Sequence, residues 1–254
     1  MSTSMLAEFG VRLVCGLALA LISISWRTVP LAFFRTQSLV MLGLLVLAIL
    51  DESRLGGSQL SRGILLLAAM MSFAASIVWG LGLPKLGLPA TILIVILTGG
   101  LLCLPTASSS GEFAIVQTGG RWASALLLGA TLTAMLLGHH YLTAPAMSIT
   151  PLRRLVILMA GALGLRSVLA LAGLGLLYSG YVPTHSPGSL SPLFLGMRWG
   201  MGILGPAVAI VLTWNTVRIR STQSATGILY IAMTLVLFGE LTSLVLSRES
   251  GVLM

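Results

Sequence analysis

The most informative property of this 254-residue chain is how little charge it carries. Only 8% of its residues are Asp, Glu, Lys or Arg, whereas an ordinary soluble domain carries about 25%. Six carboxylates, three histidines and two cysteines leave few groups that can move a proton or hold a metal. The composition therefore excludes a single soluble core, and it confines any chemistry to a small set of side chains.

The shortage of ligand-type residues also argues against a metal centre. Cys15 and Cys103 both fall inside apolar runs and make no metal-type spacing. Zinc needs more ligands than the chain offers, and no HExxH motif is present. A bis-histidine haem site needs two histidines on facing helices, yet His185 is expected in a loop on the far side from His139 and His140. We predict no metal, and haem only if a partner chain supplies a ligand.

What the chain has in abundance is apolar sequence. Hydrophobic residues make up 57% of it and the mean hydropathy is +1.05, and about 20 apolar residues suffice to cross a bilayer as a helix. We predict an all-α fold: a polytopic integral membrane helical bundle of eight transmembrane helices, forming a single domain over 1–254 with no soluble domain. The fourth span is the shortest, so seven is the alternative count. The predicted spans are 6–26, 30–50, 63–83, 88–105, 122–144, 155–178, 193–214 and 227–246.

The net charge of +8 is distributed unevenly between the two sides of the predicted membrane. We expect the protein to be integral to the cell membrane. Because Lys and Arg favour cytoplasmic loops, we also expect both termini to be extracytoplasmic. The basic side suits anionic lipid headgroups, or alternatively a phosphate-bearing ligand, whereas nucleic-acid binding has no support. The side with more basic residues holds Arg27, Lys85, Arg153, Arg154, Arg218 and Arg220, and the other holds Arg54, Arg62, Arg121 and Arg248.

Arg166, Arg198 and Glu240 fall well inside predicted spans, where charge is costly unless it is paired. Arg198 is about six residues into the seventh span and Glu240 about seven residues from the end of the eighth. Because consecutive helices run antiparallel, the two lie at similar depth, so we predict an Arg198–Glu240 ion pair, with Arg166 as an alternative partner. The pair either fixes helix register or handles a proton or substrate.

A second candidate site lies at the opposite side of the membrane. His140 shares a helical stripe with small residues and should face the bundle, while His139 should face lipid headgroups or an adjoining subunit. Arg35 and Gln37 lie at similar depth, and Tyr141 is close by. Together these side chains would suit a quinone, which needs donors for its carbonyls and an apolar slot. The alternative is that the histidines are interface residues hydrogen-bonded to loops.

In architecture the chain resembles the eight-helix quinol-oxidising membrane anchors of bacterial molybdenum oxidoreductases. The resemblance lies in the span count, the intramembrane arginines and a last span that contains Gly239-Glu240-Leu241. It implies a quinone-linked membrane subunit, and it carries over no site residue. Asn215-Thr-Val-Arg218 is similar to the arginine segment of exosortase-type membrane proteases, but the histidine expected after that arginine is missing. The Gly-x-Ser-Gly of rhomboid proteases is absent.

Two functional hypotheses follow. In the first, the chain is a non-catalytic membrane subunit of a larger, quinone-linked assembly, because its short loops leave soluble chemistry to partner subunits. In the second, it is a small-solute or ion transporter or channel. No catalytic motif is recognisable, so we do not expect an enzyme acting alone, and we favour the first hypothesis. The path in the second hypothesis would pass His140, Arg166, Arg198 and Glu240.

Overall fold

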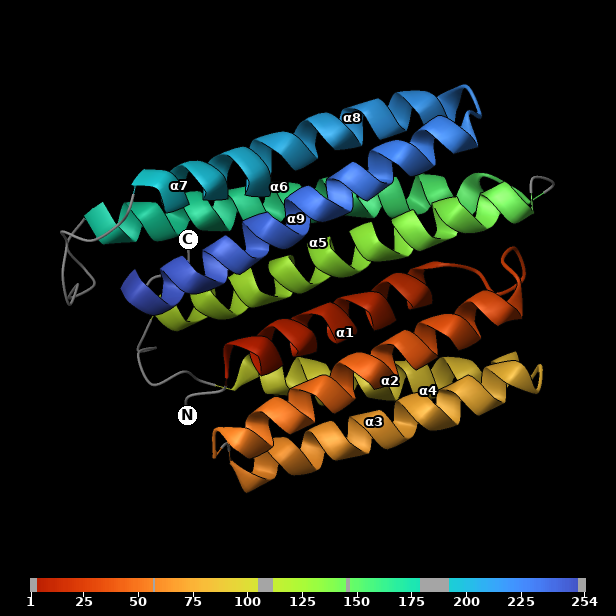
Figure 1. The fold of residues 1–254 in the computed structure, drawn as a ribbon, viewed down its shortest axis with the longest axis horizontal. Helices are drawn as coiled ribbons and strands as arrows, with labels where there is room; N and C mark the ends of the chain where they lie inside the picture. Colours follow the sequence, from red (N-terminus) through yellow and green to blue (C-terminus); the bar gives the residue numbers. More distant parts are fainter. Residues whose placement is uncertain (1–3, 57, 105–111, 145–146, 179–191, 251–254) are drawn as a thin grey trace.

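A computed structural model describes residues 4–56, 58–104, 112–144, 147–178 and 192–250. Within these ranges the regular structure is entirely helical, and the long helices run side by side (Figure 1). The expected loop at Ser179 to Pro192, with His185, lies almost wholly outside the described residues. The elements are α1 (Met5–Ser23), α2 (Leu31–Arg54), α3 (Gln59–Gly80), α4 (Pro84–Cys103), α5 (Glu112–Thr143), α6 (Thr150–Tyr178), α7 (Pro192–Trp199), η1 (Gly200–Leu204), α8 (Gly205–Arg218) and α9 (Thr222–Ser250).

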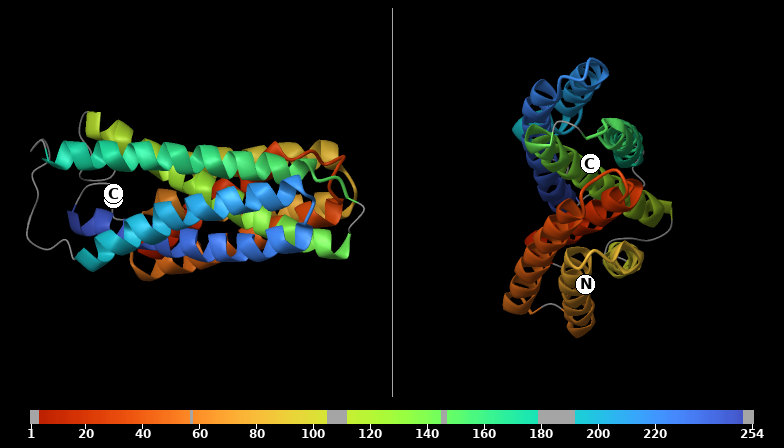
Figure 2. Two further views of the ribbon diagram at one scale, coloured as in Figure 1. Left: turned by 90° about the horizontal axis from the view of Figure 1, so that it is seen from above. Right: turned by 90° about the vertical axis from the view of Figure 1, so that its right-hand side faces the viewer.

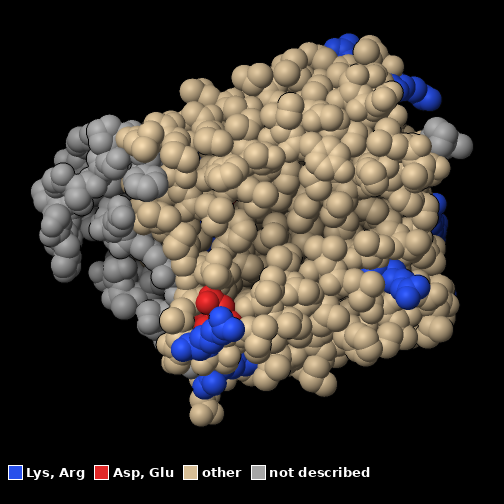
Figure 3. All heavy atoms as spheres, in the orientation of Figure 1, with Lys and Arg blue, Asp and Glu red and all other residues tan. Residues whose placement is uncertain are grey.

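Within the described residues, eight helical segments are long and apolar enough to cross a bilayer, which confirms the predicted helical bundle. They include the fourth span, a complete helix of 20 residues. Figure 3 shows basic side chains near both ends of the visible face, carboxylates beside them at one end, and a broad uncharged band between the ends. The protein is therefore a multi-pass membrane protein.

Two spans differ from the expected helices. α5 begins at Glu112, ten residues before the expected start at Trp122, because polar residues at its beginning are buried inside the bundle and not exposed in a loop. The seventh span is divided by the π-helical turn η1, in which Gly205 donates its backbone N–H to the carbonyl of Gly200. Pro206 follows immediately, and it has no N–H for the regular α-helical hydrogen bond, so the wider turn adapts the helix to the proline.

α1 and α5 form the centre of the molecule. Figure 2 shows them between α2, α3 and α4 on one side and α6, α8 and α9 on the other. At their crossing, a Cβ on Gly16 would lie 1.7 Å from the carbonyl oxygen of Ala125, and one on Gly129 would lie 1.9 Å from the carbonyl carbon of Gly16. Only glycine permits such close approach of two membrane helices. This crossing brings polar residues of α1 and α5 against the helices of the other half.

Candidate functional site

Six ionisable side chains lie together in the half of the bundle where α1 begins and α9 ends (Figure 1). They come from helices that span a membrane, and their side chains are at most 15% exposed. They form two groups, each built around one glutamate. We call Glu8, Arg12 and Arg121 the Glu8 cluster, and Glu240, Arg166 and Arg198 the Glu240 cluster.

The Glu240 cluster is completely enclosed. Arg166 binds the carboxylate in a two-point contact, with Nε 3.0 Å from Oε1 and Nη2 3.3 Å from Oε2. The same Nη2 donates to the hydroxyl of Ser243 at 2.6 Å. Arg198 lies farther away, with Nη1 3.7 Å from Oε1 of Glu240. Glu240 therefore has Arg166 as its closer partner, while the Arg198 contact favoured from the sequence is an ion pair without a hydrogen bond.

The Glu8 cluster has the same composition but a different environment. Arg12 donates through Nη2 to Oε1 of Glu8 at 2.5 Å, and Nε of Arg121 lies 3.6 Å from the same oxygen. Nη1 of Arg121 also donates to the carbonyl oxygens of Leu102 at 3.2 Å and Leu104 at 3.0 Å. These carbonyls belong to the last turn and the C-cap of α4, and the C-terminal end of a helix carries partial negative charge. Arg121 is thus bound by a glutamate and by a helix end.

Ser124 of α5 joins the two clusters. Arg12 donates through Nη1 to its hydroxyl oxygen at 3.5 Å, and the Ser124 side chain also interacts with the carboxylate of Glu240. Ser124 is fully buried. The six ionisable groups consequently form one network that reaches from α1 through α5 to α6, α7 and α9.

The network carries more positive than negative charge. Each cluster pairs two arginines with one glutamate, so each has a charge of 2 − 1 = +1. In the Glu8 cluster the end of α4 offsets the surplus. In the Glu240 cluster Arg198 is 1% exposed, and Nε, Nη1 and Nη2 make no hydrogen bond to any described residue. A buried cation in this condition is suited to accept an anion.

The polar residues predicted for a quinone make separate contacts in the structure. Arg35 is exposed and lies over α3, where a Cβ on Gly80 would be 3.4 Å from its Cδ. Tyr141 donates its hydroxyl to the carbonyl of Ser148 at 2.5 Å. His140 is half-buried, with its ring 6.1 Å from that of Phe33.

Two further placements complete this end of the bundle. Gln37 is buried, with an amide oxygen that has no hydrogen-bond partner among the described residues. His139 is exposed. The structure thus places Arg35 and His140 at the same end without bringing them into contact, and the quinone site stays a prediction.

The predicted headgroup arginines all lie on the surface at the end opposite the network. Arg153 and Arg154 are exposed in the first turn of α6, and Arg218 and Arg220 at the α8–α9 turn. Arg121, which the sequence assigned to a loop of the other side, is buried in the Glu8 cluster. Without Arg121, the side with fewer basic residues has three of them in its loops and not four. The difference in loop charge between the two sides, from which the orientation was predicted, is therefore larger. The orientation itself stays a prediction.

Sequence reasoning did not assign Glu8, Arg12, Arg121 or Ser124 to a site. One available signal is the spacing of Glu8 and Arg12, which places opposite charges one helical turn apart. Nothing in the sequence indicates that α5 carries Arg121 to the same place. Within the described residues, no group of three or more His, Cys, Asp or Glu is placed to hold a metal ion.

No family model, curated protein or solved structure matches this chain. The resemblance to quinol-oxidising membrane anchors therefore rests on the span count and the intramembrane residues alone.

Proposed function

We propose that this protein binds a small monovalent anion at Arg198 and transports it across the membrane. One observation carries the proposal: Arg198 is buried at 1% exposure, and none of its three guanidinium nitrogens has a hydrogen-bond partner among the described residues. Leaving a buried charged group without hydrogen bonds is costly. An anion beside Arg198 would supply the missing acceptors and remove the surplus charge.

The charge and the space available both favour a small monoanion. The Glu240 cluster has a surplus of 2 − 1 = +1, which one negative charge neutralises. Because Arg198 is almost inaccessible, a halide, nitrate or formate would enter with less rearrangement than a bulky organic anion. A divalent anion would leave a net negative charge in the membrane.

The broken seventh span supports transport over simple structural binding. Arg198 is in α7, directly before the π-helical turn Gly200–Leu204, and it lies about 9 Å from the start of α7 at 1.5 Å per residue. π-Helical turns occur frequently at functional sites. Discontinuous spans also build the substrate sites of many transporters. The second hypothesis from the sequence thus gains a specific observation, whereas the subunit hypothesis stays a prediction.

Thermal unfolding of the purified protein tests the binding step. We expect chloride, nitrate or formate to raise the melting temperature relative to gluconate at equal ionic strength. A ligand at a hundred times its Kd stabilises by about 2.7 kcal/mol. The Arg198→Gln variant should not respond to the anion, whereas Arg121→Gln, the matched change in the Glu8 cluster, should respond like the wild type.

Proteoliposomes with a trapped anion-sensitive dye test the transport step. The wild-type protein should admit the anion that stabilises it, and Arg198→Gln should not. Equal flux through both proteins, or stabilisation by chloride that survives Arg198→Gln, would refute the assignment of the site. Stabilisation without flux would refute transport and leave an anion that is bound permanently.

A further inference from the structure

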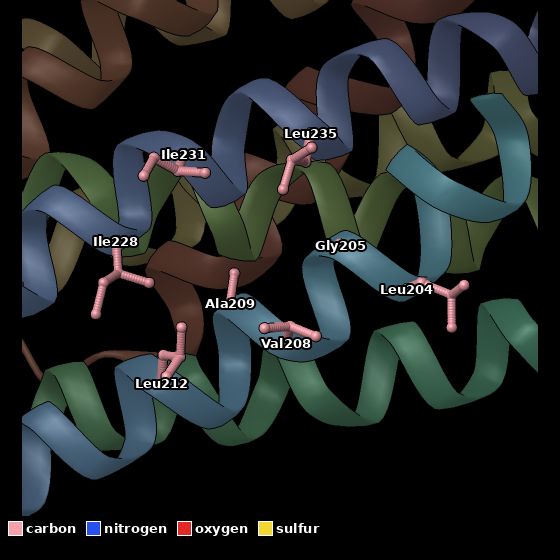
Figure 4. A pocket seen from close by; sticks show the side chains of 8 residues that line it. All are labelled: Leu204, Gly205, Val208, Ala209, Leu212, Ile228, Ile231 and Leu235. Carbon is pink, nitrogen blue, oxygen red and sulfur yellow. The ribbon is translucent and has the colours of Figure 1, made fainter.

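An apolar groove runs between α8 and α9 on the surface of the bundle, away from the arginine–glutamate network. Its volume is about 380 Å³, within the range of pockets that hold small molecules. All of its lining residues are apolar or glycine. Figure 4 shows the side chains of both helices along this groove, among them Leu204, Val208, Leu212, Ile231 and Leu235.

The groove begins within the leaflet that Arg218 borders and reaches past the middle of the membrane. Leu212 is six residues before Arg218, about 9 Å along the helix, and Leu204 is fourteen residues before it, about 21 Å. One leaflet accounts for about 15 Å of the hydrocarbon layer. The part of the groove around Leu212 therefore lies in the leaflet whose headgroups Arg218 meets, and its far end at Leu204 lies beyond the midplane.

Two exposed arginines stand at the headgroup end of the groove. Arg218 is the last residue of α8, and Arg220 lies in the turn with a φ of 58°, a left-handed conformation. Neither guanidinium forms an ion pair or hydrogen bond with a described residue. The turn Asn215 to Thr226 contains no carboxylate. Both arginines are thus available to a negatively charged group at the membrane surface.

We propose that this groove binds one anionic phospholipid. An acyl chain lies along Val208 and Leu212, and the phosphate group pairs with Arg218 and Arg220. Charge complementarity selects this occupant, because an apolar groove alone would accept any acyl chain, while the arginines at its end distinguish anionic from zwitterionic headgroups. The proposal is independent of the anion at Arg198, since it uses other residues at the opposite end of the bundle.

Native mass spectrometry of the protein from nanodiscs that contain phosphatidylglycerol and phosphatidylcholine tests the proposal. The wild type should retain one phosphatidylglycerol. Replacing both arginines (Arg218→Gln with Arg220→Gln) should weaken retention about thirtyfold, given about 1 kcal/mol for each arginine and 1.4 kcal/mol for each tenfold change. The paired change Arg153→Gln with Arg154→Gln removes the same charge at the same end and should have little effect.

A second pair of variants tests the groove itself. Val208 and Val211 are both 60% exposed on α8, but only Val208 lines the groove. Val208→Trp should fill the groove and expel the lipid, and Val211→Trp should retain it. Equal retention by these two variants, equal retention of phosphatidylcholine, or a second copy of the chain in place of the lipid would each overturn the proposal.

Discussion

The Glu8 and Glu240 clusters have the same composition, and they differ in how the second arginine is accommodated. Arg121 donates to two carbonyl oxygens at the end of α4, whereas Arg198 has no hydrogen bond within the described chain. Both arginines are less than 10% exposed. The comparison shows that a helix terminus can stabilise a surplus buried cation, and the proposed anion would have the same role at Arg198.

Exposure separates the two clusters as well. The carboxylate side chain of Glu8 is 15% exposed, and that of Glu240 is 1% exposed. Water near Glu8 can respond to a change in charge, but the surroundings of Glu240 cannot. Electrostatic interactions are stronger in the less hydrated site, so matched substitutions should have unequal effects.

The largest expected difference comes from removing each carboxylate. Glu240→Gln leaves Arg166 and Arg198 as two enclosed cations without a counter-ion, and breaking a buried pair in this way costs about 3–5 kcal/mol. Glu8→Gln should cost clearly less, because water and the end of α4 remain. The free energy of unfolding in mixed micelles measures both. Equal losses would show that the clusters do not differ in their surroundings.

The next effect should differ in sign between the two clusters. In a chloride-free gluconate buffer, Arg198→Met removes a surplus cation that makes no hydrogen bond. Without Arg198 the remaining Arg166–Glu240 pair is neutral, and because a buried charge without hydrogen bonds is costly, we expect no loss or a small gain in stability. Arg121→Met should destabilise, since each hydrogen bond from a charged group contributes about 1.5–3 kcal/mol. If Arg198→Met destabilises as strongly as Arg121→Met, Arg198 is a structural residue and the anion site is wrong.

The sequence predicted the spans well because membrane insertion depends on a local property. About 20 apolar residues in succession suffice to define a helix, and antiparallel order then gives the depth of Arg198 and Glu240. Depth alone, however, does not determine which way a side chain points. Arg35 and His140 have similar expected depths, yet Arg35 lies over Gly80, whereas the ring of His140 lies 6.1 Å from that of Phe33.

Contacts between helices that are far apart in the sequence could not be predicted in the same way. Glu8 and Arg12 join the network because α1 crosses α5 at Gly16 and Gly129, a contact between segments more than a hundred residues apart. The sequence predicts a loop position for Arg121, because the apolar run begins one residue later, at Trp122. Its burial depends on partners supplied by α1 and α4, which local hydropathy does not register.

The smallest expected effect tests whether the two clusters act together. Ser124→Ala removes the hydroxyl that contacts both Arg12 and Glu240, and a single hydrogen bond to a charged group contributes about 1.5–3 kcal/mol at most. Because both neighbours keep closer ionic partners, we expect a loss near the lower limit. A double-mutant cycle of Glu8→Gln with Glu240→Gln, in the presence and absence of Ser124, measures the coupling. If the coupling free energy disappears in Ser124→Ala, a change of charge at the more exposed Glu8 affects the proposed anion site through Ser124. If the two substitutions are strictly additive with Ser124 present, the two clusters are independent.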